Sequence, residues 1–195
     1  WIDVTGKLLQ NPGFTDNSRS GWTWESNATS KTARCDCMEF WNGTFDIWQT
    51  VSNAPQGRYR LSVQAYYRCQ DNDADYRNYQ QGRQDITAYL YAAETEQKLV
   101  SVYSASLREW VDGAWSPDWW QAFFPNTMES ARIFFDRDLY WNTLEFEAGG
   151  DFRIGLRAGS NLPSNWCIFD NFRLEYYDDL VPVTAISLSG GQIEM

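Results

Sequence analysis

The sequence predicts an all-β protein, a two-sheet antiparallel β-sandwich with one short helix near residues 126–138. Apolar and polar residues alternate with period two through most of the chain, and turn residues divide it into roughly eight to ten strands. Only one segment has clear helical spacing. With 195 residues, of which 43% are hydrophobic, the chain is long enough and apolar enough to bury the core of one sizeable domain.

Residues 57–69 form the clearest predicted strand. Its inward positions are mostly apolar, and its outward positions are Arg58, Arg60, Ser62, Gln64, Tyr66 and Arg68. Residues 86–94 repeat this pattern, with Tyr89 and Tyr91 outward. Such alternation is typical of half-buried antiparallel strands. Further strands are expected in the opening stretch and in residues 45–50, 97–104, 142–150 and 151–159, with Ala148–Asp151 as a hairpin between the last two.

The predicted helix begins after Pro125. Asn126 and Thr127 are capping candidates, and the apolar residues that follow at helical spacing are Met128, Ala131, Phe134 and Phe135. We expect this helix to pack across one edge of the sandwich.

Charge excludes several classes of partner. The formal net charge is −10, and no run of Lys or Arg occurs, which argues against nucleic acid and anionic membrane. Histidine is absent, so Ser-His and Cys-His mechanisms and imidazole metal ligation are excluded.

No apolar run has the length of a membrane span, so we expect no membrane insertion of this segment. The start at Trp1 without a signal peptide suggests a processed product.

Two polar motifs leave alternatives open. Cys35, Cys37, Cys69 and Cys167 lack the paired spacing of a zinc site, so either Cys35 or Cys37 bridges to Cys69 or all four are free thiols. Residues 71–75, "DNDAD", resemble the start of a calcium loop, but Tyr76 stands where such a loop needs glycine. We expect a solvated acidic loop there.

The last strand, residues 165–177, contains an inconsistency. Strict alternation places Asp170 on the same face as the apolar side chains of Trp166, Ile168, Phe172 and Leu174. A buried carboxylate is costly unless it is paired, hydrogen-bonded or bound to a metal. Therefore either the strand changes register at Asp170, or something at that position requires a carboxylate.

Aromatic residues are the best indication of function, because 11 Trp, 11 Tyr and 11 Phe exceed what such a core needs. Rings stack on the C–H face of a sugar, while Arg and Gln bind its hydroxyls. The predicted ligand-binding residues are Tyr66, Arg68 and Tyr89 on the sheet and Trp115, Trp119 and Trp120 in the long loop 108–124. Gln64, Tyr91 and Trp48 share the same outward pattern. The alternative is that these rings support the helix and loop that cover them.

Several motifs resemble a known group: "NPGF", "GWTWES", "FPNTMESARIFFDRDLYWNTLEFEAGGDFRIGLRAG" and "NWCIFDNFRLEYY". They are similar to the carbohydrate-binding-module-like, galactose-binding-like jelly rolls of Bacteroidetes surface proteins and multimodular glycoside hydrolases. The resemblance spans nearly all of residues 5–178. It implies a jelly roll with a binding role and no catalytic residues. It also implies a possible structural calcium ion at Asp170, with the carbonyls around Leu9–Asn11 as co-ligands; a carboxylate that accepts from loop N–H groups is the alternative.

Together these observations predict two parts of the chain. Residues 1–178 form the carbohydrate-binding-like sandwich, and residues 179–195 form a linker and the first strand of a following immunoglobulin-like module. The predicted function is a non-catalytic module that tethers a larger exported protein or glycoside hydrolase to an oligo- or polysaccharide. A spacer or protein-interaction domain is the alternative, and a glycoside hydrolase is third, since no pair of acids stands out. We expect neighbouring domains in the same chain and a cell-surface or extracellular location, with the periplasm as an alternative.

Overall fold

The computed structural model describes residues 1–118, 121–159 and 162–179. Trp119 and Trp120, and the segment predicted to begin an immunoglobulin-like module, lie outside the described residues apart from Asp179. The helices are α1 (Thr5–Leu8), α2 (Asn72–Gln80) and α3 (Met128–Asp136), with 3-10 turns η1 (Thr15–Asn17) and η2 (Val102–Ser104). The strands are β1 (Ile2–Asp3), β2 (Thr23–Ser26), β3 (Ser30–Arg34), β4 (Cys37–Trp41), β5 (Phe45–Arg68), β6 (Ala88–Ala92), β7 (Thr95–Lys98), β8 (Ala114–Trp115), β9 (Phe124–Pro125), β10 (Trp141–Ala158) and β11 (Trp166–Tyr176).

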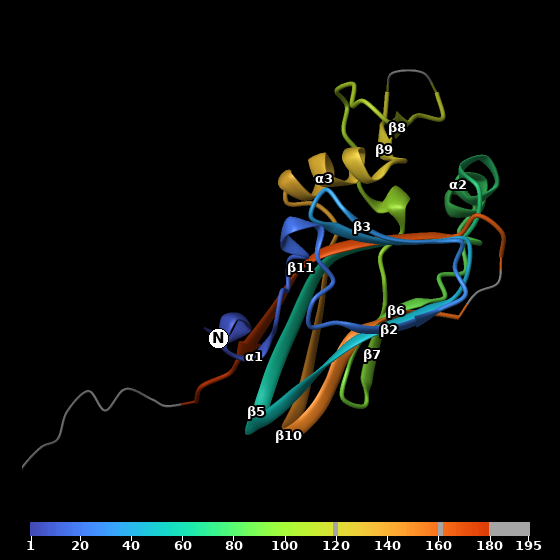
Figure 1. The fold of residues 1–195 in the computed structure, drawn as a ribbon. Coiled ribbons are helices and arrows are strands. Elements are labelled where there is room, and N and C mark those ends of the chain that lie inside the picture. The colour runs from blue at the N-terminus through green and yellow to red at the C-terminus, as the bar shows by residue number, and fades with distance from the viewer. Residues whose placement is uncertain (119–120, 160–161, 180–195) are drawn as a thin grey trace, which may run out of the picture.

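The strands confirm the predicted antiparallel β-sandwich. Nine strands form one sheet in the order β3-β4-β11-β5-β10-β6-β7, with β1 on β11 and β2 on β5, and every strand pair in it is antiparallel. The sheet folds into two layers (Figure 1). The first layer holds β3, β4, β11, the second half of β5 and the first half of β10. The second layer holds β2, β6, β7 and the remaining halves of β5 and β10.

Strands β5 and β10 therefore belong to both layers, and the predicted hairpin at Ala148–Asp151 is wrong. Gly150 has φ +68° and pairs with Ala54 between two register shifts, so β10 bends there and continues. The neighbouring strand bends at the same place, where Asn53 has φ +54°. A left-handed residue and a bulge are common means of turning a strand from one layer into the next.

Two apolar clusters hold the fold together. One lies between the layers and includes the stacked rings of Phe40, Phe45 and Phe169. The other lies on the outer face of the first layer, beneath α3, η2 and the β8–β9 pair (Figure 1). The predicted helix is confirmed: Thr127 caps α3 by accepting from Ser130 N at 3.1 Å. The predicted position across one edge of the sandwich is wrong, because Phe134 and Phe135 of α3 belong to this second cluster and the helix covers the face of the first layer.

Residues 71–75 form the start of a helix, so the predicted acidic loop is wrong. Asp71 caps α2 by accepting from Ala74 N at 3.1 Å. Asp75 is buried and accepts from the backbone N–H of Cys69 at 2.8 Å. The Asp71 carboxylate satisfies a free N–H group of the first turn, which explains why the helix begins at this acidic segment.

The structure decides between a disulfide to Cys69 and four free thiols. Cys35, Cys37, Cys69 and Cys167 are all free thiols, and all but Cys35 are buried. The disulfide alternative is therefore wrong. In the part of the chain that the structure describes, no helix is long and apolar enough to cross a membrane.

Candidate functional site

Two of the predicted sheet residues lie in the covered half of the first layer. Tyr66 is wholly buried, with ring centroids 4.8 Å from Tyr140 and 5.3 Å from Trp166. Arg68 is also buried and donates to Asn126 Oδ1 at 2.9 Å and to Ser164 O at 3.1 Å. The prediction that they face a ligand is wrong for both, because the helix layer covers this half of the face.

Tyr89 lies on a different surface, the outer face of the second layer. It is half-buried, and its strand partners are Arg157 on β10 and Lys98 on β7. Tyr91 is two residues further along β6 and opposes Gly155, whose other neighbour is Trp48 on β5. Side chains two residues apart on a strand share a face, so these rings lie together on the second layer.

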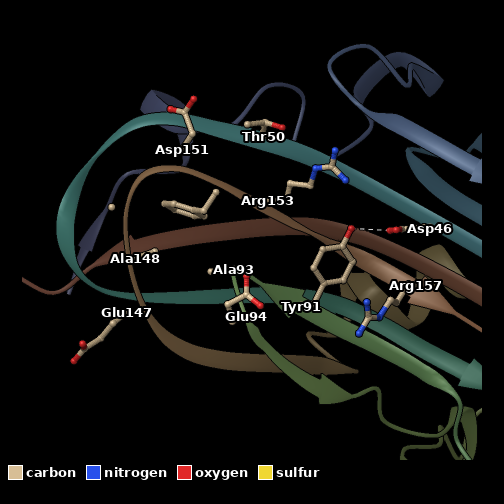
Figure 2. A pocket seen from close by; sticks show the side chains of 12 residues that line it. Asp46, Thr50, Tyr91, Ala93, Glu94, Glu147, Ala148, Asp151, Arg153 and Arg157 are labelled. Carbon is tan, nitrogen blue, oxygen red and sulfur yellow. Dashed lines mark hydrogen bonds between the residues drawn. The ribbon is translucent and has the colours of Figure 1, made fainter.

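A cleft of about 720 Å³ opens on this face, and we call it the sheet-face cleft (Figure 2). It lies where β10 bends, beside the turn between β6 and β7. Its lining residues are Asp46, Thr50, Tyr91, Ala93, Glu94, Glu147, Ala148, Gly149, Asp151, Phe152, Arg153 and Arg157.

Tyr91 is an aromatic residue of the cleft lining, and only 8% of its surface is exposed. Its hydroxyl donates to Asp46 Oδ1 at 2.6 Å, as Figure 2 shows. Its ring lies over Gly155, since a Cβ at that position would be 2.9 Å from Tyr91 Cζ. Burial, followed by the bond to Asp46, raises the pKa of Tyr91 well above its usual value. The phenol therefore remains protonated and can hold Asp46 in place.

Two arginines from β10 flank the ring. The Arg157 guanidinium lies 5.4 Å from the Tyr91 ring centroid and forms an ion pair with Glu96. The Arg153 guanidinium lies 4.8 Å from the Trp48 ring centroid, on the strand position opposite Thr50. A guanidinium stacked on a ring is fixed in orientation and keeps its N–H edge available for hydrogen bonds.

Carboxylates of Glu94, Glu147 and Asp151 also line the cleft. In Figure 2 Glu94 lies near the middle of the view, whereas the carboxylates of Glu147 and Asp151 point outward. Asp151 also accepts from the backbone N–H of Asn53 at 2.9 Å. In the described residues no group of three or more His, Cys, Asp or Glu is placed to hold a metal ion. The cleft therefore offers a ring with hydrogen-bond donors and acceptors, which suits a polyhydroxylated ligand.

The predicted loop residue Trp115 lies in a second, smaller cleft at the helix end of the sandwich. Its half-buried ring packs 5.5 Å from Tyr76 and 6.1 Å from Phe124. This loop cleft measures about 430 Å³ and is lined by Asp73, Tyr76, Arg77, Gln80, Trp115, Pro117 and Asp118. It is separate from the sheet-face cleft, with which it shares no lining residue.

Asp170 faces the helix layer. Both explanations offered for a carboxylate on this apolar face hold: the strand changes register there, and a partner requires the charge. The pairing of β11 with β5 shifts register between Asp170 and Arg173, and Asn171 has φ +55°. Hence Trp166 and Ile168 face the helix layer, whereas Phe172 and Leu174, after the shift, lie in the core between the layers. Asp170 is buried, and Arg132 Nη1 on α3 lies 2.5 Å from its Oδ2. Burial raises the pKa of Asp170 to about 6, against the opposing effect of Arg132.

The two carboxylate oxygens of Asp170 differ: Oδ2 pairs with Arg132, whereas the buried Oδ1 faces Gly13 of the N-terminal loop without a hydrogen-bond partner in the described residues. Arg132 already supplies a positive charge, and two of the expected co-ligand carbonyls are bonded elsewhere: Gln10 O accepts from Gln49 Nε2, and Asn11 O accepts from Trp22 Nε1. The last strand is instead joined to the N-terminal loop by Phe172 N, which donates to Pro12 O at 2.9 Å. Calcium at Asp170 stays a prediction.

No protein-family model and no curated protein matches the chain. Among solved structures, the chain is similar to the carbohydrate-binding module TmCBM61 in complex with β-1,4-galactotriose, at 15% identity and a TM-score of 0.44, over 87% of this chain and 98% of that one. It is also similar to the K3 adhesin domain of Lys-gingipain from Porphyromonas gingivalis, at 10% identity and a TM-score of 0.41, over 86% of this chain and 98% of that one.

A third similar structure is a proposed sugar-binding protein from Bacteroides thetaiotaomicron, at 10% identity and a TM-score of 0.38, over 87% of this chain and 99% of that one. The likeness concerns the course of the chain, and the site itself rests on the residues described above.

Proposed function

We propose that this chain is a non-catalytic carbohydrate-binding domain whose ligand lies in the sheet-face cleft. The observation that supports it most is the group of hydrogen-bonding side chains around the largely buried Tyr91, namely Asp46, Arg153 and Arg157. The hydroxyls of a sugar can donate hydrogen bonds to these carboxylates and accept them from these guanidinium groups. The domain then tethers a larger exported protein or glycoside hydrolase to glycan, at the cell surface or in the extracellular space.

The experiment is a glycan array followed by affinity electrophoresis in gels that contain the polysaccharides identified. Arg153→Ala removes a guanidinium from the cleft, and we expect it to weaken binding about tenfold or more, the loss of one or two hydrogen bonds to a charged group. The matched control is Arg34→Ala, which removes another exposed strand arginine, from the first layer. Chemical unfolding of each variant verifies that the fold is intact.

Three further results would change this proposal. If Trp115→Ala abolishes binding while Arg153→Ala does not, the ligand lies in the loop cleft. Absence of binding to plant, host and algal glycans favours a spacer or protein-interaction domain. Release of reducing ends from any polysaccharide contradicts the non-catalytic role.

A further inference from the structure

The charge of the sheet-face cleft restricts the kind of glycan that it can hold. Its lining includes four carboxylates, those of Asp46, Glu94, Glu147 and Asp151, and two arginines, Arg153 and Arg157. The lining therefore has a formal charge of −2 from these six residues. The whole chain adds to this field, because its net charge is −10.

The arginines cannot offset these acids at the rim. Arg157 forms an ion pair with Glu96, which neutralises its charge locally. Arg153 stacks on Trp48 and is the remaining positive group of the lining. Glu94 and Glu147 are both exposed, and within the described residues neither has an ion-pair partner. A ligand that enters the cleft therefore meets more uncompensated carboxylates than guanidinium groups.

Resting on the proposed function, we propose that the sheet-face cleft is specific for uncharged glycans and rejects those with uronate or sulfate groups. Free carboxylates accept hydrogen bonds from sugar hydroxyls, and Arg153 donates to a hydroxyl or ring oxygen. An anionic sugar has fewer hydroxyls to donate, and it adds a like charge. One added anion about 7 Å from a rim carboxylate lowers affinity about threefold in a water-like dielectric.

The test compares two ligands with the same backbone. A neutral polysaccharide that binds in the array is oxidised at its primary alcohols to the uronate, and both forms are titrated by calorimetry at low salt. We expect the oxidised form to bind at least threefold more weakly. Salt near 0.5 M should bring the ratio of neutral to oxidised affinity closer to one, because the Debye length falls to about 4 Å.

The variant Glu94→Gln/Glu147→Gln tests whether the rejection is local. Each change removes a charge and keeps the size of the side chain, and we expect the ratio of neutral to oxidised affinity to fall toward one. The control Glu109→Gln/Glu129→Gln makes the same change in net charge at exposed acids that do not line the cleft. We expect it to leave the ratio at the wild-type value.

The outcomes separate this inference from the proposed function. If neither form binds, the proposed function fails and the inference fails with it. If the oxidised form binds as tightly as the neutral one, the inference alone is overturned and glycan binding stands. A ratio that changes equally in both double variants also overturns it, because the preference would then come from net charge and not from the cleft.

Discussion

The ring of Tyr91 occupies the space that a side chain at Gly155 would need. A Cβ built on Gly155 lies 2.8 Å from the Tyr91 hydroxyl and 2.1 Å from the carbonyl oxygen of Ile47, which is backbone on the neighbouring strand. Glycine is disfavoured inside strands because it has no side chain to pack. Its presence in β10 is explained by the close approach of this ring.

Gly155→Ala should therefore damage both stability and binding. The contact with a backbone carbonyl cannot be relieved by a rotamer change, so we expect a loss of about 2 kcal/mol in the free energy of unfolding. Displacement of Tyr91 should weaken glycan binding as well. Urea unfolding and affinity electrophoresis measure the two effects. The matched control is Gly6→Ala in α1, where nothing lies within 4 Å of the new methyl group and stability should be unchanged or slightly higher. Equal stability of both variants would contradict the packing argument.

Arg132→Met should show that Asp170 needs its counter-charge. Asp170 is buried and Arg132 is the only ion-pair partner it has within the described residues. Removing one partner of a buried pair leaves the other charge uncompensated, so we expect a loss of about 3 kcal/mol at pH 7. The double variant Arg132→Met/Asp170→Asn should recover part of this loss. Arg34→Met is the control, because its partner Glu129 is exposed and the pair contributes less than about 1 kcal/mol.

The pH dependence of stability should differ between the wild type and Asp170→Asn. Burial raises the pKa of Asp170 from 3.8 to about 6, so between these values the native state binds a proton that the unfolded chain does not. The free energy of unfolding then falls as pH rises from 4 to 6, by an amount on the order of 2 kcal/mol. Urea titrations at several pH values should show this decrease in the wild type and not in Asp170→Asn. If the free energy of unfolding had the same pH dependence in both proteins, the raised pKa of Asp170 would be refuted.

Tyr66→Phe should be harmless, contrary to the ligand-binding role that the sequence predicts. The Tyr66 hydroxyl is buried and has no hydrogen-bond partner within the described residues. Its removal should leave the free energy of unfolding unchanged or raise it by up to about 1 kcal/mol. Tyr140→Phe is a matched control, because that hydroxyl donates to Val102 O at 2.7 Å and its loss leaves a buried acceptor unpaired. Loss of glycan binding in Tyr66→Phe would contradict the buried placement.

The sequence alone determined the local features of this protein. Period-two alternation along β5 correctly separates Tyr59, Leu61 and Val63, which lie in the core between the layers, from the outward side chains. The capping residue and apolar spacing of α3 were equally visible. Both are local properties, because a strand repeats every two residues and a helix every 3.6. The outward pair Arg153 and Arg157 was also visible in the alternation, but nothing in the sequence placed it beside Tyr91.

Only the tertiary structure decided which outward residues are open to a ligand. Tyr66 and Tyr91 have the same pattern in the sequence, yet Tyr66 is fully buried under the helix layer, whereas Tyr91, 8% exposed, borders the sheet-face cleft. The difference depends on the path of residues 100–118 and 121–136, which lie over one half of β5 and leave the other half uncovered (Figure 1). The register that sets Tyr91 against Gly155 and the bend shared by β5 and β10 are likewise long-range pairings. Alternation tells which way a side chain points, whereas its burial depends on segments far away in the chain.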